Sequence, residues 1–127
     1  RQWLSAQRLD GTVPFGVGAS AVKAAVEHLG YVQIDTIHVI ERCHHHILFT
    51  RIPGYRREDL HRAQVQDKTV FEYWTHALSY VPTQDLAHFV RAMKSGWRRF
   101  ASWYGAVSEA DIRRLVKRIA EDGPLTW

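Results

Sequence analysis

Two polar side chains within an otherwise apolar segment are the first candidates for chemistry. Gln33 and Asp35 are separated by Ile34 and follow Val32. On a β-strand, residues two apart lie on the same face, roughly 6–7 Å from each other. A carboxamide and a carboxylate at that distance can hold one water molecule or one small reacting group. The spacing is therefore compatible with a reactive site here, provided that residues 31–35 form a strand.

A purely structural role accounts for the same residues. Asp35, which precedes Thr36, can form a turn or cap a short helix by accepting hydrogen bonds from backbone N–H groups. A three-residue motif has little specificity by itself. The tripeptide alone leaves both interpretations open.

Three consecutive histidines, His44 to His46, are candidate metal ligands. If they lie on a strand, His44 and His46 share a face, which is a spacing that metal sites use. Asp35, His38 or His76 can supply a third ligand. The alternative is that one histidine is a structural hydrogen-bond partner and another is exposed.

The spacing of apolar residues predicts the elements that position these groups. A helix over residues 20–29, capped by Ser20 and ended by Gly30, leads into the strand that carries Gln33. Residues 36–41 do not decide between strand and helix, and residues 44–51 favour a strand because Ile, Leu and Phe follow one another. The other expected elements are a helix at 2–9, a helix at 58–66, strands at 70–74 and 77–81, and a helix from 84 to about 103.

A last helix has the clearest boundaries, because Ser108 begins a capping-box pattern and Gly123-Pro124 follows its end. Ile112, Leu115, Val116 and Ile119 are expected to form its inner stripe, and Thr126 is placed to cap a further helix. The order of elements predicts an α+β, mostly helical fold with a winged helix-turn-helix domain. Residues 1–82 would form this domain, and residues 83–127 a long connecting helix and the opening helix of a second winged-helix unit.

Composition sets broad limits on the protein. The chain has 127 residues, of which 46% are hydrophobic, so it can bury a real core. No apolar run approaches the roughly 18 residues of a membrane span. The single cysteine, Cys43, forms no internal disulfide, which fits a reducing, cytoplasmic compartment. Because the chain lacks an initial Met and stops just after a loop, we expect it to be an excerpt of a longer protein.

The net charge of +4 is unevenly distributed. Residues 1–81 contain nine basic residues (Lys or Arg) and eight acidic ones (Asp or Glu). Residues 82–127 contain eight basic residues and five acidic ones. Arg91, Lys94, Arg98 and Arg99 lie largely off the apolar stripe of the helix predicted there. A basic excess can attract a polyanion such as DNA, although an ordinary basic surface has the same composition.

Several segments together resemble one enzyme family. The run from Leu29 to Ile37 (Leu-Gly-Tyr-Val-Gln-Ile-Asp-Thr-Ile) is similar to the N-terminal motif of the winged-helix DNA glycosylases of the YcaQ/AlkZ type, in the branch that carries Gln-x-Asp. Arg42-Cys43-His44-His45 resembles the family's Arg-Ala-His-His segment, and the run from Phe71 to Ala77 its Phe-Glu-Tyr-Trp-Ala-His-Ala segment. Gly123 begins a match to its Gly-Pro-Leu-Thr turn. The departures are Cys43, Thr75 and the additional His46, and none of them alters the Gln-x-Asp pair.

The resemblance implies a DNA repair glycosylase that hydrolyses the N-glycosidic bond of N-alkylated purines, including those in interstrand crosslinks. It implies that Asp35 is the catalytic carboxylate and Gln33 its partner, without metal or other cofactor. No lysine is near this pair in sequence, which favours a monofunctional glycosylase. The residues that the matched segments assign to DNA or base binding are Arg42, His44, His45, Arg51, Tyr73 and His76; Trp74 is expected in the core.

The predicted partner is double-stranded DNA with alkylated or crosslinked bases, which would associate the protein with the nucleoid. We expect a monomer that is inactive as an isolated piece, since extruding a base usually needs a wedge and a clamp that one module lacks. The alternative is a winged-helix transcriptional regulator that binds DNA without catalysis.

Overall fold

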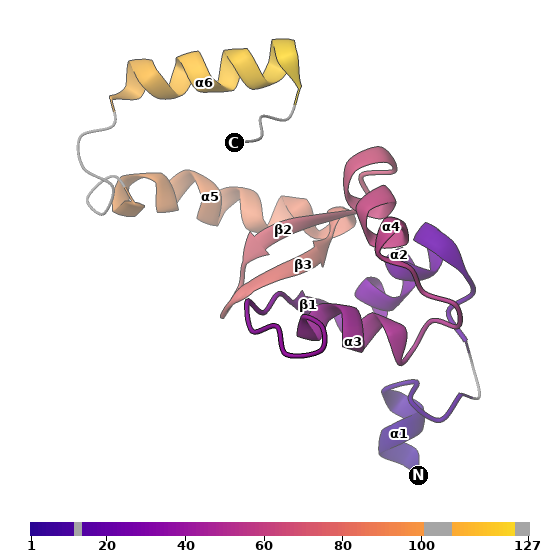
Figure 1. Ribbon diagram of the computed structural model, residues 1–127. Helices are drawn as coiled ribbons and strands as arrows, with labels where there is room; N and C mark the ends of the chain where they lie inside the picture. The colour runs from indigo at the N-terminus through magenta and orange to yellow at the C-terminus, as the bar shows by residue number, and fades with distance from the viewer. Residues whose placement is uncertain (12–13, 101–107, 124–127) are drawn as a thin grey trace. The chain divides into compact units, whose positions relative to one another are not determined.

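The computed structural model describes residues 1–11, 14–100 and 108–123, with residues 96–100 described by their backbone alone. Helices predominate and accompany a small antiparallel sheet, which confirms the mixed α+β class (Figure 1). The chain divides into two compact units, Arg1–Leu86 and Ala87–Trp127. None of the helices in the described part of the chain is long and apolar enough to cross a membrane.

The core of the first unit is built around helix α2 (Gly18–Leu29). Its buried residues recur at helical spacing, and Val22 and Val26 are completely enclosed. Gly30 ends the helix with a φ of +79°, a conformation that glycine adopts without steric cost. The expected cap at Ser20 is wrong, because the helix begins at Gly18 after Val17. Ser20 lies within the first turn, where its hydroxyl donates to the Val17 carbonyl.

The sheet has three antiparallel strands in the order β1-β3-β2, namely β1 (Val32–Gln33), β2 (Val70–Trp74) and β3 (Leu78–Pro82). The expected hairpin at 70–81 is confirmed, with Tyr73 opposite Ser79. Strand β1 adds to the free edge of β3 and places Gln33 opposite Ser79. The sheet therefore joins the Gln33 segment to strand β3, which lies more than forty residues later in the chain.

The strand expected over residues 44–51 is wrong: this segment forms helix α3 (Cys43–Phe49). His44 and Leu48 are four residues apart and are buried on one face of the helix, and Ile52 just after the helix is also buried, whereas Phe49 is exposed. Packing against β1 therefore overrides the β-propensity of Ile, Leu and Phe. Residues 36–41 form a loop rather than a helix.

The remaining helices of the first unit are short. Helix α1 (Gln2–Ala6) ends earlier than the expected 2–9, and His28 donates a hydrogen bond from Nε2 to the Ala6 carbonyl at 2.8 Å. The helix expected at 58–66 is confirmed as α4 (Arg57–His61), which continues as the π-helical turn η1 (Arg62–Gln66). Leu60 and Ala63 are the residues of this segment that enter the core.

A 3₁₀ turn η2 (Thr83–Asp85) leads from the sheet into α5 (Leu86–Phe100), which begins close to the expected position. The second unit also contains α6 (Glu109–Asp122), whose start is capped by Ser108 as expected: the Asp111 N–H donates to Ser108 Oγ at 3.1 Å. The inner stripe expected on α6 is not buried in the described structure, since Leu115, Val116 and Ile119 are exposed. The expected extension of α5 to about residue 103 and the cap at Thr126 lie outside the described residues.

Candidate active site

Gln33 lies at the end of β1, where the edge of the sheet brings it to the hairpin. Its Oε1 is 3.3 Å from Nε2 of His76, which lies in the connection between β2 and β3. The His76 ring also contacts the ring of Tyr31 in an edge-on arrangement, with centroids 5.2 Å apart. Tyr31 and Gln33 thus share the strand face opposite the buried Val32. Two segments that the resemblance singled out meet at this contact.

Asp35 lies beyond the strand rather than on it. Strand β1 ends at Gln33, so strand alternation does not set the distance between Gln33 and Asp35 as expected. Oδ1 of Asp35 accepts a hydrogen bond from the Ile37 N–H at 2.9 Å, which is the turn that the structural interpretation predicted. The side chain is half-buried. Within the described residues it forms no ion pair, so this carboxylate is not neutralised by a fixed cation.

Cys43 connects the two polar residues, and sequence reasoning did not include it in the site. It begins α3, and its thiol donates to the Gln33 carbonyl at 3.5 Å. Burial and, to a lesser extent, the negative charge of Asp35 raise the pKa of the Cys43 thiol. Asp35 and Gln33 therefore lie near one protonated thiol, which is not activated as a nucleophile. The resemblance has alanine here, which gave no signal of this contact.

A cavity of about 260 Å³ opens beside Asp35. It is bounded by the loop that follows Asp35 and by the start of α3, and its other lining residues are Ile37, Val39, Ile40, Glu41, Cys43 and His46. This volume lies just below the range of roughly 300–1,000 Å³ that is typical of small-molecule sites. The candidate carboxylate therefore faces a space in which a small group can bind.

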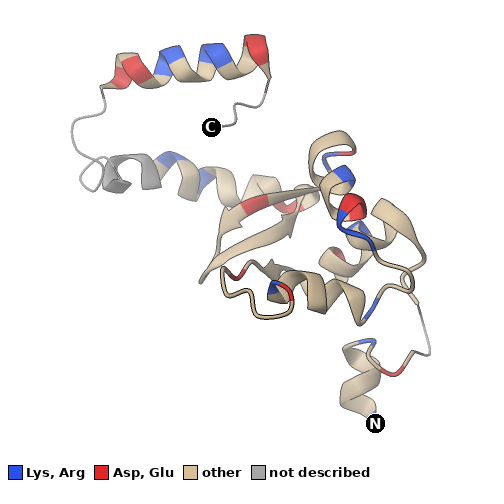
Figure 2. Cartoon of the chain, viewed as in Figure 1, with Lys and Arg blue, Asp and Glu red and all other residues tan. Residues whose placement is uncertain are grey.

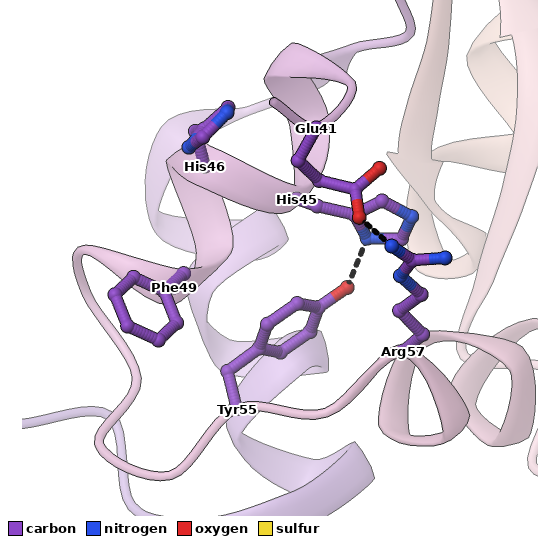
Figure 3. A pocket seen from close by; sticks show the side chains of 6 residues that line it. All are labelled: Glu41, His45, His46, Phe49, Tyr55 and Arg57. Carbon is purple, nitrogen blue, oxygen red and sulfur yellow. Dashed lines mark hydrogen bonds and ion pairs between the residues drawn. The ribbon is translucent and has the colours of Figure 1, made fainter. Parts of the chain in front are cut away.

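A second cavity of about 290 Å³ shares Glu41 and His46 with the first. Figure 3 shows its walls, which include the rings of Phe49 and Tyr55. His45 Nδ1 lies 2.7 Å from the Tyr55 hydroxyl, and Glu41 forms an ion pair with Arg57. Burial lowers the pKa of His45 and raises that of Tyr55. Sequence reasoning missed Glu41, Tyr55 and Arg57, because none belongs to a recognisable motif.

His44 lies on the buried face of α3 and is only 3% exposed. Its ring lies against those of His45 and Tyr80, with centroids 4.2 and 5.6 Å away. Burial, together with His45 and Arg42, lowers its pKa to about 4, so His44 is neutral near pH 7. His46 is exposed instead, so the shared face that the metal alternative required does not exist. In the described part of the chain, no three His, Cys, Asp or Glu side chains are arranged to hold a metal ion.

The other expected DNA-binding residues are scattered. Arg51 is half-buried and donates from Nε to the Gln7 carbonyl at 3.0 Å and from Nη1 to the Ile47 carbonyl at 3.1 Å. Arg42 is exposed at the start of α3, and Tyr73 is half-buried with its ring 6.4 Å from that of Phe71. The core position expected for Trp74 is wrong, since this side chain is 65% exposed.

The basic residues of α6 are balanced by acidic ones on the same helix. Figure 2 shows acidic and basic bands along it. Each cation lies within 4.0 Å of an acid three or four residues away, in the pairs Glu109–Arg113, Asp111–Arg114, Lys117–Glu121 and Arg118–Asp122. Arg91 and Lys94 of α5 are exposed, and neither is in an ion pair with another described residue.

Residues 26–127 match the model of one protein family, which is described as DNA glycosylase AlkZ-like. The match covers most of the chain and includes Gln33, Asp35, α3 and the hairpin. No solved structure matches the chain.

Proposed function

The chain belongs to the AlkZ-like DNA glycosylase family, and on that premise we propose that it hydrolyses the N-glycosidic bond of N-alkylated purines in DNA, including interstrand crosslinks. The proposed catalytic residue is Asp35, with Gln33 as its partner. Double-stranded DNA is the proposed partner, bound by a monomer that associates with the nucleoid.

One observation supports this proposal above the others. Gln33 is oriented by His76 from the hairpin, while Asp35 is half-buried at a cavity and lacks an ion-pair partner among the described residues. A carboxylate whose role was confined to a buried salt bridge would be neutralised and enclosed, and Asp35 is neither within the described residues. Asp35 instead combines a fixed position, given by its turn, with access to a space that a ligand can enter.

The proposed chemistry needs little acid catalysis. Alkylation at N7 places a positive charge on the purine, so the base leaves without first being protonated. The sugar then acquires oxocarbenium character, which a nearby carboxylate stabilises electrostatically. The same carboxylate can accept a proton from an attacking water, and the Gln33 amide can orient that water or the sugar-phosphate. Water as the nucleophile corresponds to a monofunctional glycosylase, and neither cavity is lined by a lysine among the described residues.

The other residues of the matched segments are proposed to have different roles. His76 and Tyr73 would contact the extruded base, and Arg42 a phosphate. The interior contacts of His44, His45 and Arg51 favour positioning of α3 and its neighbours over direct contact with DNA. The sheet and helices of the first unit would constitute a winged-helix domain with β2 and β3 as its wing, and α5 and α6 would begin a second one.

The test is base release from a duplex that carries an N7-alkylguanine crosslink. The parent should release the base, Asp35→Asn should lose release by about 10²-fold or more while it keeps DNA binding, and Asp67→Asn, at an exposed acid of the same unit, should match the parent. Equal release by the Asp35→Asn variant would move the catalytic group elsewhere. No release by either protein, with DNA still bound, would favour a transcriptional regulator.

A further inference from the structure

The loop that follows Asp35 exposes three large aliphatic side chains to solvent. Ile37, Val39 and Ile40 are 68%, 88% and 84% exposed. Together with Asp35 they line the same cavity. Each exposed aliphatic chain forgoes the stabilisation of burial, so three within four residues indicate an interaction surface.

The loop is braced rather than loosely extended. Its first turn is closed by the hydrogen bond from the Ile37 N–H to Asp35, and a β-bridge pairs His38 with Arg42. Glu41 holds the far end of the loop in place. Its side chain accepts a hydrogen bond from the Arg42 N–H at 2.9 Å and forms an ion pair with Arg57 of α4. The exposed aliphatic side chains are therefore presented from a fixed backbone.

The exposed arginines beside the loop, together with the DNA glycosylase family to which the chain belongs, favour DNA as the partner of this surface. The side chain of Glu41 is only 18% exposed, whereas its partners Arg57 and His38 are 66% and 55% exposed. Arg42 is exposed beside them, and Asp35 is half-buried. The guanidinium groups of Arg42 and Arg57 are thus exposed beside an apolar tip, while the carboxylates of Glu41 and Asp35 are set back. An apolar protein partner would not need an exposed guanidinium group beside the tip, whereas the phosphates that flank a base step can contact Arg42.

We propose that residues 37–40 are a DNA wedge, whose aliphatic side chains enter the base stack of a duplex and stabilise the gap left when the damaged nucleotide is extruded toward Asp35. This inference rests on the proposed function, because it assigns the loop to the same reaction site. Branched aliphatic side chains unstack base steps in this way in proteins that bend or open DNA. This proposal replaces the expectation that the chain lacks a wedge. The wedge follows the proposed catalytic residue, Asp35, shortly afterwards in the chain.

The experiment compares Val39→Ser/Ile40→Ser with the parent on two substrates. In the first, the alkylated purine is paired within a duplex; in the second, the same purine is in a single-nucleotide bulge and has no partner. The double variant should release base from the paired substrate about tenfold more slowly or worse, because extrusion from an intact stack is what a wedge assists. It should act on the bulged substrate as the parent does. Val65→Ser, at a less exposed aliphatic residue on η1, is the matched control and should leave both rates unchanged.

A second readout needs no base release. With Asp35→Asn as the background, binding to a duplex that carries 2-aminopurine beside the lesion should raise its fluorescence, and adding Val39→Ser/Ile40→Ser should abolish the rise while binding is kept. Because this fluorescence change needs no base release, it would support the wedge even if the parent released no base. Failure of the glycosylase proposal can therefore be told apart from failure of the wedge proposal. Equal loss of release on both substrates would overturn the wedge and make the loop part of the cavity wall. The wedge proposal would also be overturned if the double variant left the rates and the fluorescence unchanged. The same holds if the double variant changed the sedimentation of the protein from that of a dimer to that of a monomer.

Discussion

At the scale of single residues, the contact between Gln33 and His76 is the point at which two distant segments meet. We expect Gln33→Ala and His76→Ala each to slow base release, and the double variant to be less impaired than the product of the two effects. One hydrogen bond contributes about 0.5–1.5 kcal/mol, so the coupling should amount to roughly 2- to 12-fold. Single-turnover kinetics on all four proteins measure it.

Asp67→Asn/Gln33→Ala provides a matched control, because the exposed Asp67 pairs with Arg62 and not with Gln33 or His76. Its two effects should multiply independently. Strict multiplication for Gln33 and His76 as well would show that their 3.3 Å contact does not operate in the reaction.

His44 makes stability depend on pH. Its folded-state pKa of about 4 lies below the ordinary 6.5, so between these values the unfolded chain binds the proton more tightly. The free energy of unfolding should therefore fall as the pH is lowered from about 6.5 to 4, by up to about 3 kcal/mol at about 1.4 kcal/mol per pKa unit. Urea unfolding at a series of pH values measures this loss.

The variant to compare is His44→Gln, which lacks the titrating ring and should show a shallower dependence over the same window, whatever its stability at pH 7. Thr50→Ala, at an exposed residue that has no titratable group, should keep the slope of the parent. An unchanged slope in His44→Gln would mean that another group titrates in its place.

At the scale of elements, Arg51 ties two helices together. It follows α3 and donates to carbonyls of Gln7, just after α1, and of Ile47 within α3. Arg51→Met keeps the length of the side chain but removes these donors. We expect it to lower the free energy of unfolding by about 1.5–3 kcal/mol, as for hydrogen bonds from charged groups, and to leave DNA affinity close to that of the control.

The control is Arg62→Met, which removes one positive charge from an exposed pair with Asp67 and should cost less than about 1 kcal/mol. Both variants are followed by thermal unfolding and by DNA titration. A stable Arg51→Met protein with weakened DNA binding would instead return Arg51 to the DNA interface.

For the molecule as a whole, the distribution of charge predicts which helix contributes to DNA binding. The cations of α6 are paired within the helix, whereas Arg91 and Lys94 of α5 are exposed outside such pairs in the described structure. Each phosphate contact contributes about 0.9 to the slope of log K against log salt. Arg91→Ala/Lys94→Ala should therefore reduce this slope by about one to two.

Arg113→Ala/Lys117→Ala removes the same charge from α6 and should change the slope less. Titrations of duplex DNA at several salt concentrations compare the two variants. A larger effect from the α6 pair would show that DNA competes successfully for its intrahelical ion pairs, which are weak in water.

Local patterns in the sequence determined several elements correctly. Alternating residues and a short connection predict the hairpin, and the apolar spacing with Gly30 predicts α2, because these signals depend on neighbours along the chain. Ser108 predicts the start of α6 for the same reason. The similarity of several segments to one family, which the family match confirms over residues 26–127, indicated a DNA glycosylase.

Tertiary structure decided what local signals could not. Residues 44–51 have β-propensity, yet His44 and Leu48 lie on one buried face because the chain is helical there, and burial in the core outweighs a propensity difference of about 1 kcal/mol. Helix α3 then separates His44 from His46 and removes the basis for a metal site.

The candidate site was partly visible in the sequence. Gln33 and Asp35 could be named from their types and spacing, but the contact of Gln33 with His76, the contact of the Cys43 thiol with the Gln33 backbone carbonyl and the cavity beside Asp35 all come from chain pairing across the sheet and from α3. The sequence by itself determined which groups can react and which short elements carry them. Only the tertiary structure decided which of them meet, because contacts between residues far apart in the chain are fixed by the packing of the core and not by their neighbours in sequence.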